Sequence, residues 1–453
     1  MSLIFLSLLA SSWGLVTPDQ QVTTRDVCVI GGGSAGTYAA VRLQEMNQSV
    51  VVVEKTGRLG GQTETYVDPE TNIAVEYGVI FLDNITVVHN YFGSLGVPLK
   101  PVSIAGDVQP RGVDLRSGTI IGDPQGNLTE GMARYASQLL RYPYLANGFD
   151  LPWVVPRDLL LPFGEFADKY HLGPAVEPIA SVVGGVGDIL RQSTLYVMKT
   201  FSLEVLQGAQ KGFLGTQSGS NTDLYVAAQN RLEGNVLFNS TVAEMDRNNR
   251  DSNWVHVIVQ SRDGRQLVKA RRILFAIPPK LDNLNGVDLD RVERDLFGQF
   301  SNTFYYTMLA RIDGFPPNTA IVNRANDTRY HIPQVPSVYS IRSSRVPGLY
   351  NIWYGSEHSL TEDEVKADVV ATIQRLQAVD IHASTPEFVA FSAHQPFQLT
   401  VPSKAIARGF YRRLQTLQGR SRTFYTGATF ETHDSARIWR FTEDLLQTMV
   451  RGL

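Results

Sequence analysis

The chain has 453 residues, of which 43% are hydrophobic, and this length is too great for a single ordinary core. The formal net charge of −3 excludes a global basic field that would attract nucleic acid or an acidic membrane. Cys28 is the one cysteine, which excludes a disulfide within the chain and any cysteine-based metal cluster.

The first residues predict a signal peptide over residues 1–14. The apolar run 3–10 is too short to span a bilayer, and Ser12 and Gly14 are small residues suited to cleavage. No Lys or Arg precedes the run, so an ordinary N-terminal extension is the alternative. We expect a secreted or secretory-pathway glycoprotein, and no later stretch is apolar enough for a transmembrane helix. The Asn-x-Ser/Thr acceptors are Asn47, Asn84, Asn127, Asn239 and Asn326.

The first folded element is predicted to be a compact βαβ unit. A strand is expected at 26–30, a helix from Ser34 to about Met46, and a valine-rich strand at 49–54. Cys28 lies in the apolar run of the first strand, so we expect it to be a small buried hydrophobe.

A glycine-rich turn joins the first strand to the helix. Gly31, Gly33 and Gly36 fill the G-x-G-x-x-G positions, which provide a tight turn, a close approach to pyrophosphate and close packing of the helix on the strand. The helix N-terminus, at Ser34 and Ala35, offers free N–H groups to phosphates.

An acidic residue ends the second strand of this unit. Glu54 stands about twenty residues beyond the turn, where a carboxylate accepts hydrogen bonds from the adenosine ribose. An acid here disfavours a 2′-phosphate, so the pattern predicts FAD or NAD in preference to NADP.

The rest of the chain alternates between helical and strand-rich regions. Residues 106–224 look helical and irregular, with a glycine loop at 183–187 that follows no convincing strand and is not a second nucleotide site. Strands are then expected at 235–238, 242–245, 254–259, 272–277, 338–341, 350–354 and 423–426. Helices are expected at 361–378, which opens on a capping-box pattern, and at about 435–450.

The loop after Glu54 favours FAD over NAD. It resembles the second flavin motif, G-R-x-G-G-R-x-x-T, of the flavin-containing amine oxidase superfamily. The resemblance implies that Gly60 and Gly61 let the loop pass over the pyrophosphate and that Arg58, with Lys55 nearby, supplies positive charge. Gln62 stands where the family usually has arginine, so one phosphate contact is expected to be weaker.

Three later segments extend this resemblance. Residues 74–81, with Gly78 and Val79, resemble the segment that lies against the isoalloxazine ring, and Val242 matches the position that packs on the adenine. The strand and turn 272–279 look like the family's V-x-A-x-P-P segment.

The C-terminal segment completes the family pattern with one departure. Ala428 follows Gly427 where the family has an acid bonded to the ribityl chain, and Glu431 is the candidate substitute. The helix N-terminus near Ser435 is expected to stabilise negative charge on the reduced flavin. The segment 409–441 is most similar to the fungal β-cyclopiazonate dehydrogenase-like group.

The resemblance implies an α/β protein in which a Rossmann-type FAD-binding domain is interleaved with a mixed α+β substrate domain. The FAD-binding parts are expected at 25–105, 225–285 and 396–453. The substrate domain is expected at 106–224, mostly helical, and at 286–395, a sheet plus a helix.

The activity expected from the resemblance is oxidation of a small-molecule substrate, an amine or an activated C–H compound, with hydride transfer to flavin N5. One dinucleotide fingerprint leaves no obvious seat for NAD(P)H, so O₂ is the expected electron acceptor. Trp353, Tyr354 and Trp439 are candidates for shaping the pocket, and His394 is a candidate base.

Two alternatives remain open at this point. The first is a flavin-dependent double-bond isomerase acting on a fatty acid or another lipid, and the second is a non-catalytic binding protein such as the prenyl-protein chaperones of the same fold. No histidine pair has metal-ligand spacing and no Ser/His/Asp set stands out, so we expect no metal site.

Overall fold

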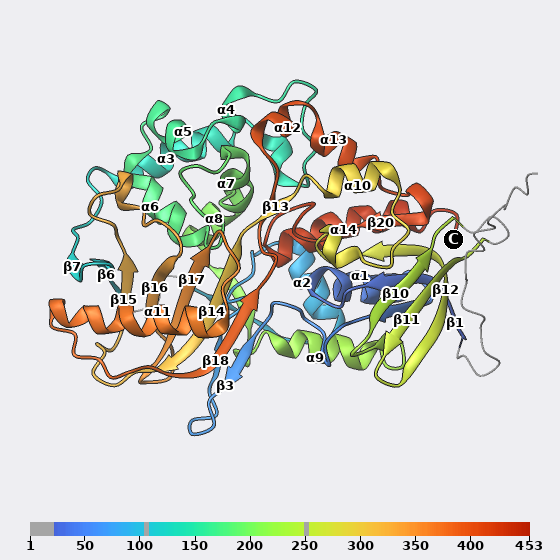
Figure 1. Ribbon diagram of the computed structural model, residues 1–453, viewed down its shortest axis with the longest axis horizontal. Coiled ribbons are helices and arrows are strands. Elements are labelled where there is room, and N and C mark those ends of the chain that lie inside the picture. Colours follow the sequence, from blue (N-terminus) through green and yellow to red (C-terminus); the bar gives the residue numbers. More distant parts are fainter. Residues whose placement is uncertain (1–21, 104–107, 249–252) are drawn as a thin grey trace, which may run out of the picture.

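The computed structural model describes residues 22–103, 108–248 and 253–453. Two sheets lie at opposite ends of the long axis, and a group of short helices covers the space between them on one side (Figure 1). The predicted signal peptide falls outside the described residues.

The first sheet is assembled from three separate parts of the chain. Its order is β10-β11-β12-β1-β2-β9, and β20 pairs in parallel with the last residues of β12. β1, β2, β9 and β12 are also parallel, whereas β10 and β11 form an antiparallel extension. The strands are β1 (Val22–Ile30), β2 (Val50–Val53), β9 (Val236–Leu237), β10 (Thr241–Asp246), β11 (Val255–Ser261), β12 (Gly264–Phe275) and β20 (Thr423–Tyr425).

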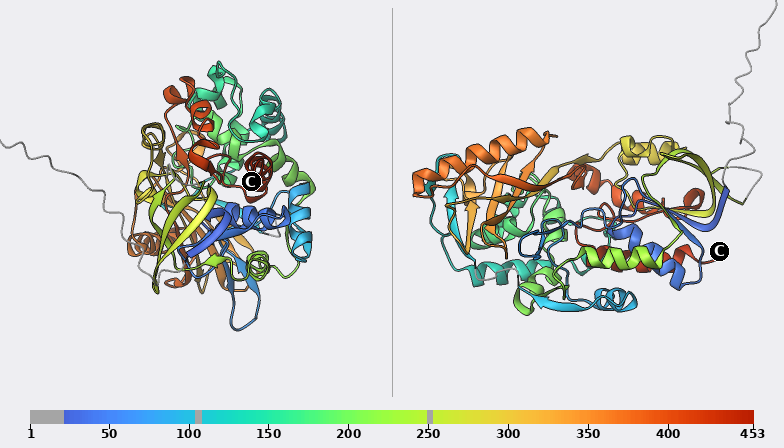
Figure 2. Two further views of the ribbon diagram at one scale, coloured as in Figure 1. Left: turned by 90° about the vertical axis from the view of Figure 1, so that its right-hand side faces the viewer. Right: turned by 90° about the horizontal axis from the view of Figure 1, so that it is seen from below.

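Helices from both ends of the chain pack beside this sheet. The first helix, α1 (Ser34–Glu45), packs along the last, α14 (Ser435–Met449), which also touches α2 (Thr86–Ser94). Tyr38 of α1 stacks on Trp439 of α14 with ring centroids 5.9 Å apart. A further helix, α9 (Thr222–Arg231), lies along α1, as Figure 2 shows in its right-hand view.

The second sheet carries one long helix on one of its faces. Its order is β18-β14-β17-β16-β15-β6-β7, antiparallel except for the β15–β6 pair. The helix α11 (Glu362–Arg375) lies across it in Figure 1 and buries Val365, Val369 and Ile373. The strands are β6 (Gln109–Asp114), β7 (Thr119–Ile120), β14 (Phe304–Arg311), β15 (Thr319–Asn323), β16 (Ser337–Ser343), β17 (Leu349–Ser356) and β18 (Glu387–His394).

Short elements fill the remaining volume. The two-stranded pairs are β3 (Thr65–Val67) with β4 (Ala74–Glu76), β5 (Leu99–Val102) with β8 (Phe213–Thr216), and β13 (Ser301–Asn302) with β19 (Leu399–Thr400). The short helices are α3 (Leu128–Leu139), α4 (Arg157–Leu160), α5 (Phe163–Lys169), α6 (Gly173–Val182), α7 (Thr194–Thr200), α8 (Leu203–Lys211), α10 (Arg291–Phe297), α12 (Ser403–Ala407) and α13 (Phe410–Gln415).

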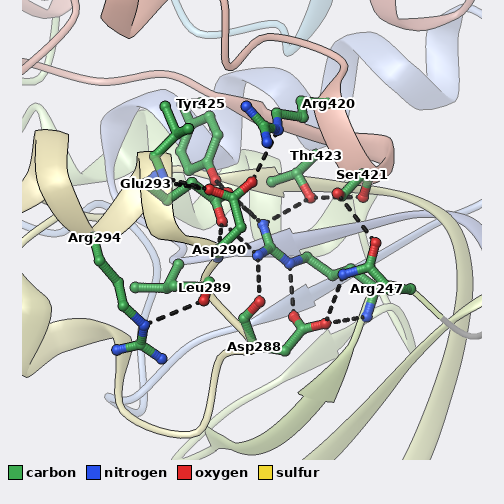
Figure 3. Close-up of polar contacts among 12 residues, drawn as sticks. Arg247, Asp288, Leu289, Asp290, Glu293, Arg294, Arg420, Ser421, Thr423 and Tyr425 are labelled. Carbon is green, nitrogen blue, oxygen red and sulfur yellow. Dashed lines mark hydrogen bonds and ion pairs between the residues drawn. The ribbon is translucent and has the colours of Figure 1, made fainter.

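A buried arginine ties the middle and last parts of the first sheet together (Figure 3). Arg247, after β10, pairs with Glu293 of α10 at 2.6 Å and with Asp288 at 2.7 Å. Tyr425 of β20 donates its hydroxyl to Glu293 at 2.5 Å. The paired carboxylates offset the cost of burying the guanidinium, whose side chain is fully enclosed.

The fold class expected from the sequence is confirmed, and several element boundaries differ. The region 106–224 contains strands as well as helices, because β6 pairs with β15 of the distant second sheet. Its sequence, Gln-Pro-Arg-Gly-Val-Asp, has no alternating apolar pattern, so only tertiary pairing makes it a strand. The predicted helix 361–378 ends at Arg375 and continues as a 3₁₀ turn, Leu376–Val379.

Cys28 is fully buried in β1, and burial raises the pKa of its thiol to about 12. It therefore behaves as the small apolar side chain that its sequence context predicts. Among the described helices, none combines the length and the apolar character needed to cross a membrane.

Candidate functional site

The glycine-rich turn has the geometry of a dinucleotide-binding turn. Gly31 adopts a φ of +100°, which a side chain rarely tolerates, and a Cβ on Gly36 would lie 1.8 Å from the Gly31 oxygen. Gly33 precedes α1, and no side chain caps that helix. The first-turn N–H groups of Ser34 and Ala35 are therefore available to a phosphate.

The second glycine motif lies directly on the first. Gly60 donates its N–H to the Gly32 oxygen at 2.9 Å, and a Cβ on Gly61 would lie 2.9 Å from Gly33 Cα. Only glycine permits this contact between two backbones. The two motifs, predicted from separate patterns, are thus brought together as one cradle.

Arg58 shapes this second loop from within. Its guanidinium donates to the backbone oxygens of Gly61 and Thr63, both at 3.0 Å, and pairs with Glu64 at 2.6 Å. Its charge is therefore shared with Glu64, and the expected phosphate contact stays a prediction. Lys55 and Gln62 are exposed on the same loop.

Glu54 joins the two motifs. One carboxylate oxygen accepts the N–H of Gly32 at 2.7 Å, and the other accepts the N–H and hydroxyl of Thr56, each at 2.8 Å. The side chain is thus held at the end of β2 beside the glycine turn. This is where the sequence predicts a carboxylate for the ribose.

The N-termini of α1 and α14 meet at this cradle. Ser34 donates its hydroxyl to the Ser435 hydroxyl at 2.9 Å. The phenol of Tyr225, from α9, faces the hydroxyls of Ser34, Thr63 and Ser435, and burial raises its pKa. The Tyr225 ring also lies against Gly60, whose added Cβ would meet it at 2.9 Å. Sequence reasoning missed Tyr225, because nothing in α9 marks it out.

The remaining predicted cofactor positions lie around this point. Gly78 packs against the second loop, where a Cβ would lie 2.1 Å from the Gln62 oxygen, and the Val79 oxygen accepts from Asn221 at 2.8 Å. Val242 is half-buried on β10, where the register with β11 shifts. Gly427 has a φ of +106° with open space beside it, and Ala428 is half-buried.

Glu431 does not replace the family's ribityl-binding acid. Its carboxylate is fully buried and pairs with Lys199 at 2.5 Å and with Arg437 at 2.7 Å. Burial lowers the pKa of Lys199 to about 7, and the nearby Arg437 lowers it too, while Glu431 opposes the shift. The expectation for Glu431 is wrong because its oxygens are committed to these buried cations.

Two aromatic candidates for the substrate pocket lie elsewhere. Trp439 is enclosed between α1 and α2, and its indole N–H donates to the Ser34 hydroxyl at 3.0 Å. Tyr354 is 2% exposed on the face of β17 that packs against α11, and its hydroxyl donates to Asp368. Side chains alternate along a strand, so Trp353, which is half-buried, faces the opposite side.

His394 lies on the side of the second sheet opposite α11, in a cluster of rings. Its Nε2 is 3.3 Å from the Thr307 hydroxyl, and Tyr305 lies beside it on β14. Burial is the main cause that lowers the pKa of His394 to about 4.

Rings link this strand to the C-terminal loop before α14. Phe397 stacks on His433 with centroids 3.9 Å apart, and Tyr305 lies 4.9 Å from Phe397. Burial lowers the pKa of His433 to about 4. The sequence did not single out His433, which stands two residues before Ser435 and thus near the cradle.

Known proteins share this arrangement and its sequence. Residues 29–92 match the NAD(P)-binding Rossmann-like domain family. An FAD-dependent oxidoreductase of Cochliobolus heterostrophus is 36% identical over 450 residues, covering 96% of this chain and 93% of the relative. The chain belongs to the FAD-dependent oxidoreductases. Another relative, β-cyclopiazonate dehydrogenase of Aspergillus oryzae, is 34% identical over 434 residues, covering 94% and 93%.

Solved structures share the fold at low sequence identity. A fatty acid isomerase of P. acnes that produces CLA superposes with a TM-score of 0.77 at 17% identity, covering 94% of this chain and 99% of that one. Cyclohexylamine oxidase of Brevibacterium oxydans gives a TM-score of 0.62 at 18% identity, covering 94% and 99%. The predicted family and the predicted cofactor, FAD, are confirmed by the relatives.

The residues of the cradle fit FAD. The α1 N-terminus is uncapped, two glycine backbones leave an open approach, and Glu54 presents a carboxylate beside them. Ile80, in the segment expected along the isoalloxazine ring, leaves 40% of its surface exposed, as suits an apolar side chain that a flat ring system covers. The glycine backbones thus suit the pyrophosphate, the Glu54 carboxylate suits the ribose, and the apolar Ile80 suits the ring.

Proposed function

We propose that this FAD-dependent oxidoreductase oxidises an amine, or a specialised metabolite with a similarly activated C–H bond, and passes the electrons to O₂. When bound, FAD supplies the two-electron acceptor for a hydride from the substrate carbon. The substrate also loses a proton, and O₂ takes up two electrons and two protons to become hydrogen peroxide. The balance therefore needs no nicotinamide.

The observation that supports this proposal is the uncharged ring cluster between the second sheet and the cradle. His394 and His433 both have a pKa near 4 and are neutral at neutral pH. Phe397 lies between them, stacked on His433 with ring centroids 3.9 Å apart, and Tyr305 packs against both Phe397 and His394. Such a surface suits an amine in its unprotonated form, or another neutral organic molecule, whose proton leaves to a nearby acceptor.

We further propose that His394 accepts that proton. It is neutral, 5% exposed, and oriented by Thr307. We expect His394→Gln to bind FAD normally but to slow anaerobic flavin bleaching by about 10²–10⁴-fold, the usual range for general base catalysis. His382→Gln, which changes an exposed histidine, is the matched control. An unchanged bleaching rate in His394→Gln would remove this role.

The oxidase activity is tested by the fate of the electrons. We expect a panel of amines and nitrogen-containing metabolites to include a compound that bleaches the flavin under nitrogen. Air should then restore the colour and produce hydrogen peroxide in step with product, whereas NAD(P)H alone should reduce the flavin slowly.

The isomerase alternative predicts another outcome for the same assay. Turnover at full rate without oxygen, with a product isomeric with the substrate, would replace the oxidase proposal. Linoleic acid belongs in the panel for this reason. The non-catalytic alternative is set aside, because the relatives that define the family are named as oxidoreductases and a dehydrogenase.

A further inference from the structure

Charged side chains surround the first turn of α14. They come from the segment before α2, from α7 and α8, from the loop before α14 and from α14 itself. The acids are Asp83, Glu204, Glu431 and Asp434, and the cations are Lys199, Arg437 and Arg440. Buried charges are costly, so each one requires a partner.

Three of the four acids have donors. Glu431 pairs with Lys199 and Arg437, and Glu204 pairs with Arg440 at 3.2 Å. Asp434 caps α14 by accepting the N–H of Arg437 at 3.0 Å. Each of the three cations thus has a carboxylate partner within the cluster, although the Nε–H groups of Arg437 and Arg440 have no acceptor among the described residues.

Asp83 is the exception. It is 2% exposed, and within the described residues no N–H or O–H group donates to either of its carboxyl oxygens. Its carboxyl group faces that of Asp434, which raises the pKa of Asp83. Two carboxylates cannot hydrogen-bond to each other unless one of them carries a proton.

We propose that Asp83 and Asp434 form a carboxylic acid–carboxylate pair that retains one proton at neutral pH, and that this proton sets the charge at the N-terminus of α14 beside FAD. Asp83 holds the proton and donates its O–H to Asp434, which remains free to cap the helix. With the proton in place, the carboxylates of Glu204, Glu431 and Asp434 face the basic side chains of Lys199, Arg437 and Arg440.

The surroundings explain why Asp83 takes up the proton. Burial is the main cause that raises its pKa to about 9, and the charge of Asp434 adds to the shift. Glu204, from α8, raises the pKa slightly further, while Arg437, from α14, lowers it. An isolated negative charge at this depth is more costly than a proton taken from solvent.

The position of the pair gives the proton a function. Asp434 immediately precedes Ser435, which meets Ser34 at the cradle that binds FAD. Loss of the proton places an additional negative charge beside a helix N-terminus that otherwise favours electrons on FAD. We therefore expect deprotonation of Asp83 to lower the flavin midpoint potential.

Asp83→Asn mimics the protonated acid and tests the proposal. Potentiometric titration of the FAD-loaded protein should give the same midpoint potential as wild type at pH 7. Above about pH 9, the wild-type potential should fall further than that of Asp83→Asn. Asp444→Asn, which removes an exposed charge from the same helix, should follow wild type throughout.

Two further measurements do not depend on activity. The infrared spectrum at pH 8 should contain the carbonyl band of a protonated carboxylic acid, sensitive to deuterium, that Asp83→Asn lacks. Folding should also take up about one proton between pH 4 and pH 9, so wild-type stability should fall with rising pH and Asp83→Asn should lack that component.

Absence of the infrared difference, or the same alkaline potential in both proteins, would overturn the proposal. Both results are independent of whether O₂ is the electron acceptor, so the oxidase proposal and this one fail separately. If Asp83→Asn folds poorly, the wild-type protein alone still tests the proposal. The infrared band of the protonated acid should be present at pH 8 and lost above pH 10, and its absence at pH 8 would overturn the proposal.

Discussion

Single residues set the contact between the two glycine motifs, and Glu54 is the clearest case. It binds the Gly32 N–H and Thr56 from the end of β2. The expected bonds between its carboxylate and the ribose hydroxyls would be charge-assisted, worth roughly 1.5–3 kcal/mol. We expect Glu54→Ala to weaken FAD binding by about ten- to a hundred-fold, measured by flavin release on dilution.

The control for this change is Glu130→Ala, which removes an exposed carboxylate from α3. It should bind FAD as wild type does. Full flavin occupancy of Glu54→Ala after exhaustive dialysis would contradict the ribose assignment.

At the scale of single residues, the sequence predicted those site residues whose geometry depends only on residues nearby in the chain. The spacing of Gly31, Gly33 and Gly36 is local, so the turn could be derived without a structure. Tyr225 reaches the cradle only through tertiary packing of α9, and no local pattern marks it. Tyr354 was expected to shape the substrate pocket, but it packs against α11. Which of two adjacent strand residues faces a given side depends on the register of the strand with its neighbours, and the sequence of one strand does not specify that register.

Among the elements, the glycine loop 183–187 has a role that its sequence pattern did not indicate. Gly185 has a φ of +83°, and an added Cβ would lie 2.4 Å from the Phe397 ring. The loop thus lets Phe397 lie flat between the helical region and β14. Gly185 is needed for packing between elements that are distant in sequence, so no neighbouring strand pattern indicates its role.

We expect Gly185→Ala to destabilise the protein by about 2 kcal/mol or more, from backbone strain and displacement of the ring. Thermal unfolding would report it, together with a changed flavin spectrum if His433 shifts with Phe397. Gly93→Ala is the control, because no atom lies within 4 Å of its added Cβ in α2, and it should be neutral or slightly stabilising. Equal melting temperatures for the two variants would contradict this reading.

The Arg247 network joins elements of the first sheet that the sequence places far apart. Arg247→Ala leaves Glu293, 2% exposed, without its guanidinium partner. We expect a loss of about 3–5 kcal/mol in the free energy of unfolding, measured by urea titration. Arg265→Ala, which removes an exposed pair with Glu244, should cost about 0–1 kcal/mol. A small effect in both variants would show that the buried network is dispensable.

For the whole molecule, the predicted fold class is confirmed because the order and spacing of the family motifs along the chain indicate it. The strand pairings that join distant segments do not follow from local sequence. The pairing of β20 with β12 connects residues about 150 positions apart, and that of β6 with β15 connects residues about 210 positions apart. Such pairings are decided by the complete set of neighbours, which no window of sequence contains.

Export is a further whole-molecule prediction. All five Asn-x-Ser/Thr acceptors are exposed, as an oligosaccharide requires. We expect glycosidase treatment of protein from its native source to lower the apparent mass, and N-terminal sequencing to begin near Leu15. An unchanged mass with an intact Met1 would place the protein in the cytosol instead.

The packing of the first helix, α1, against the last, α14, has a consequence for biosynthesis. A ribosome releases α1 long before α14, so the nascent chain carries half of a cofactor cradle throughout translation. We therefore expect FAD loading to follow synthesis of α14, and a stop codon before α14 would remove the helix that packs on α1 at the cradle. Messages truncated there should yield colourless protein, destined for degradation.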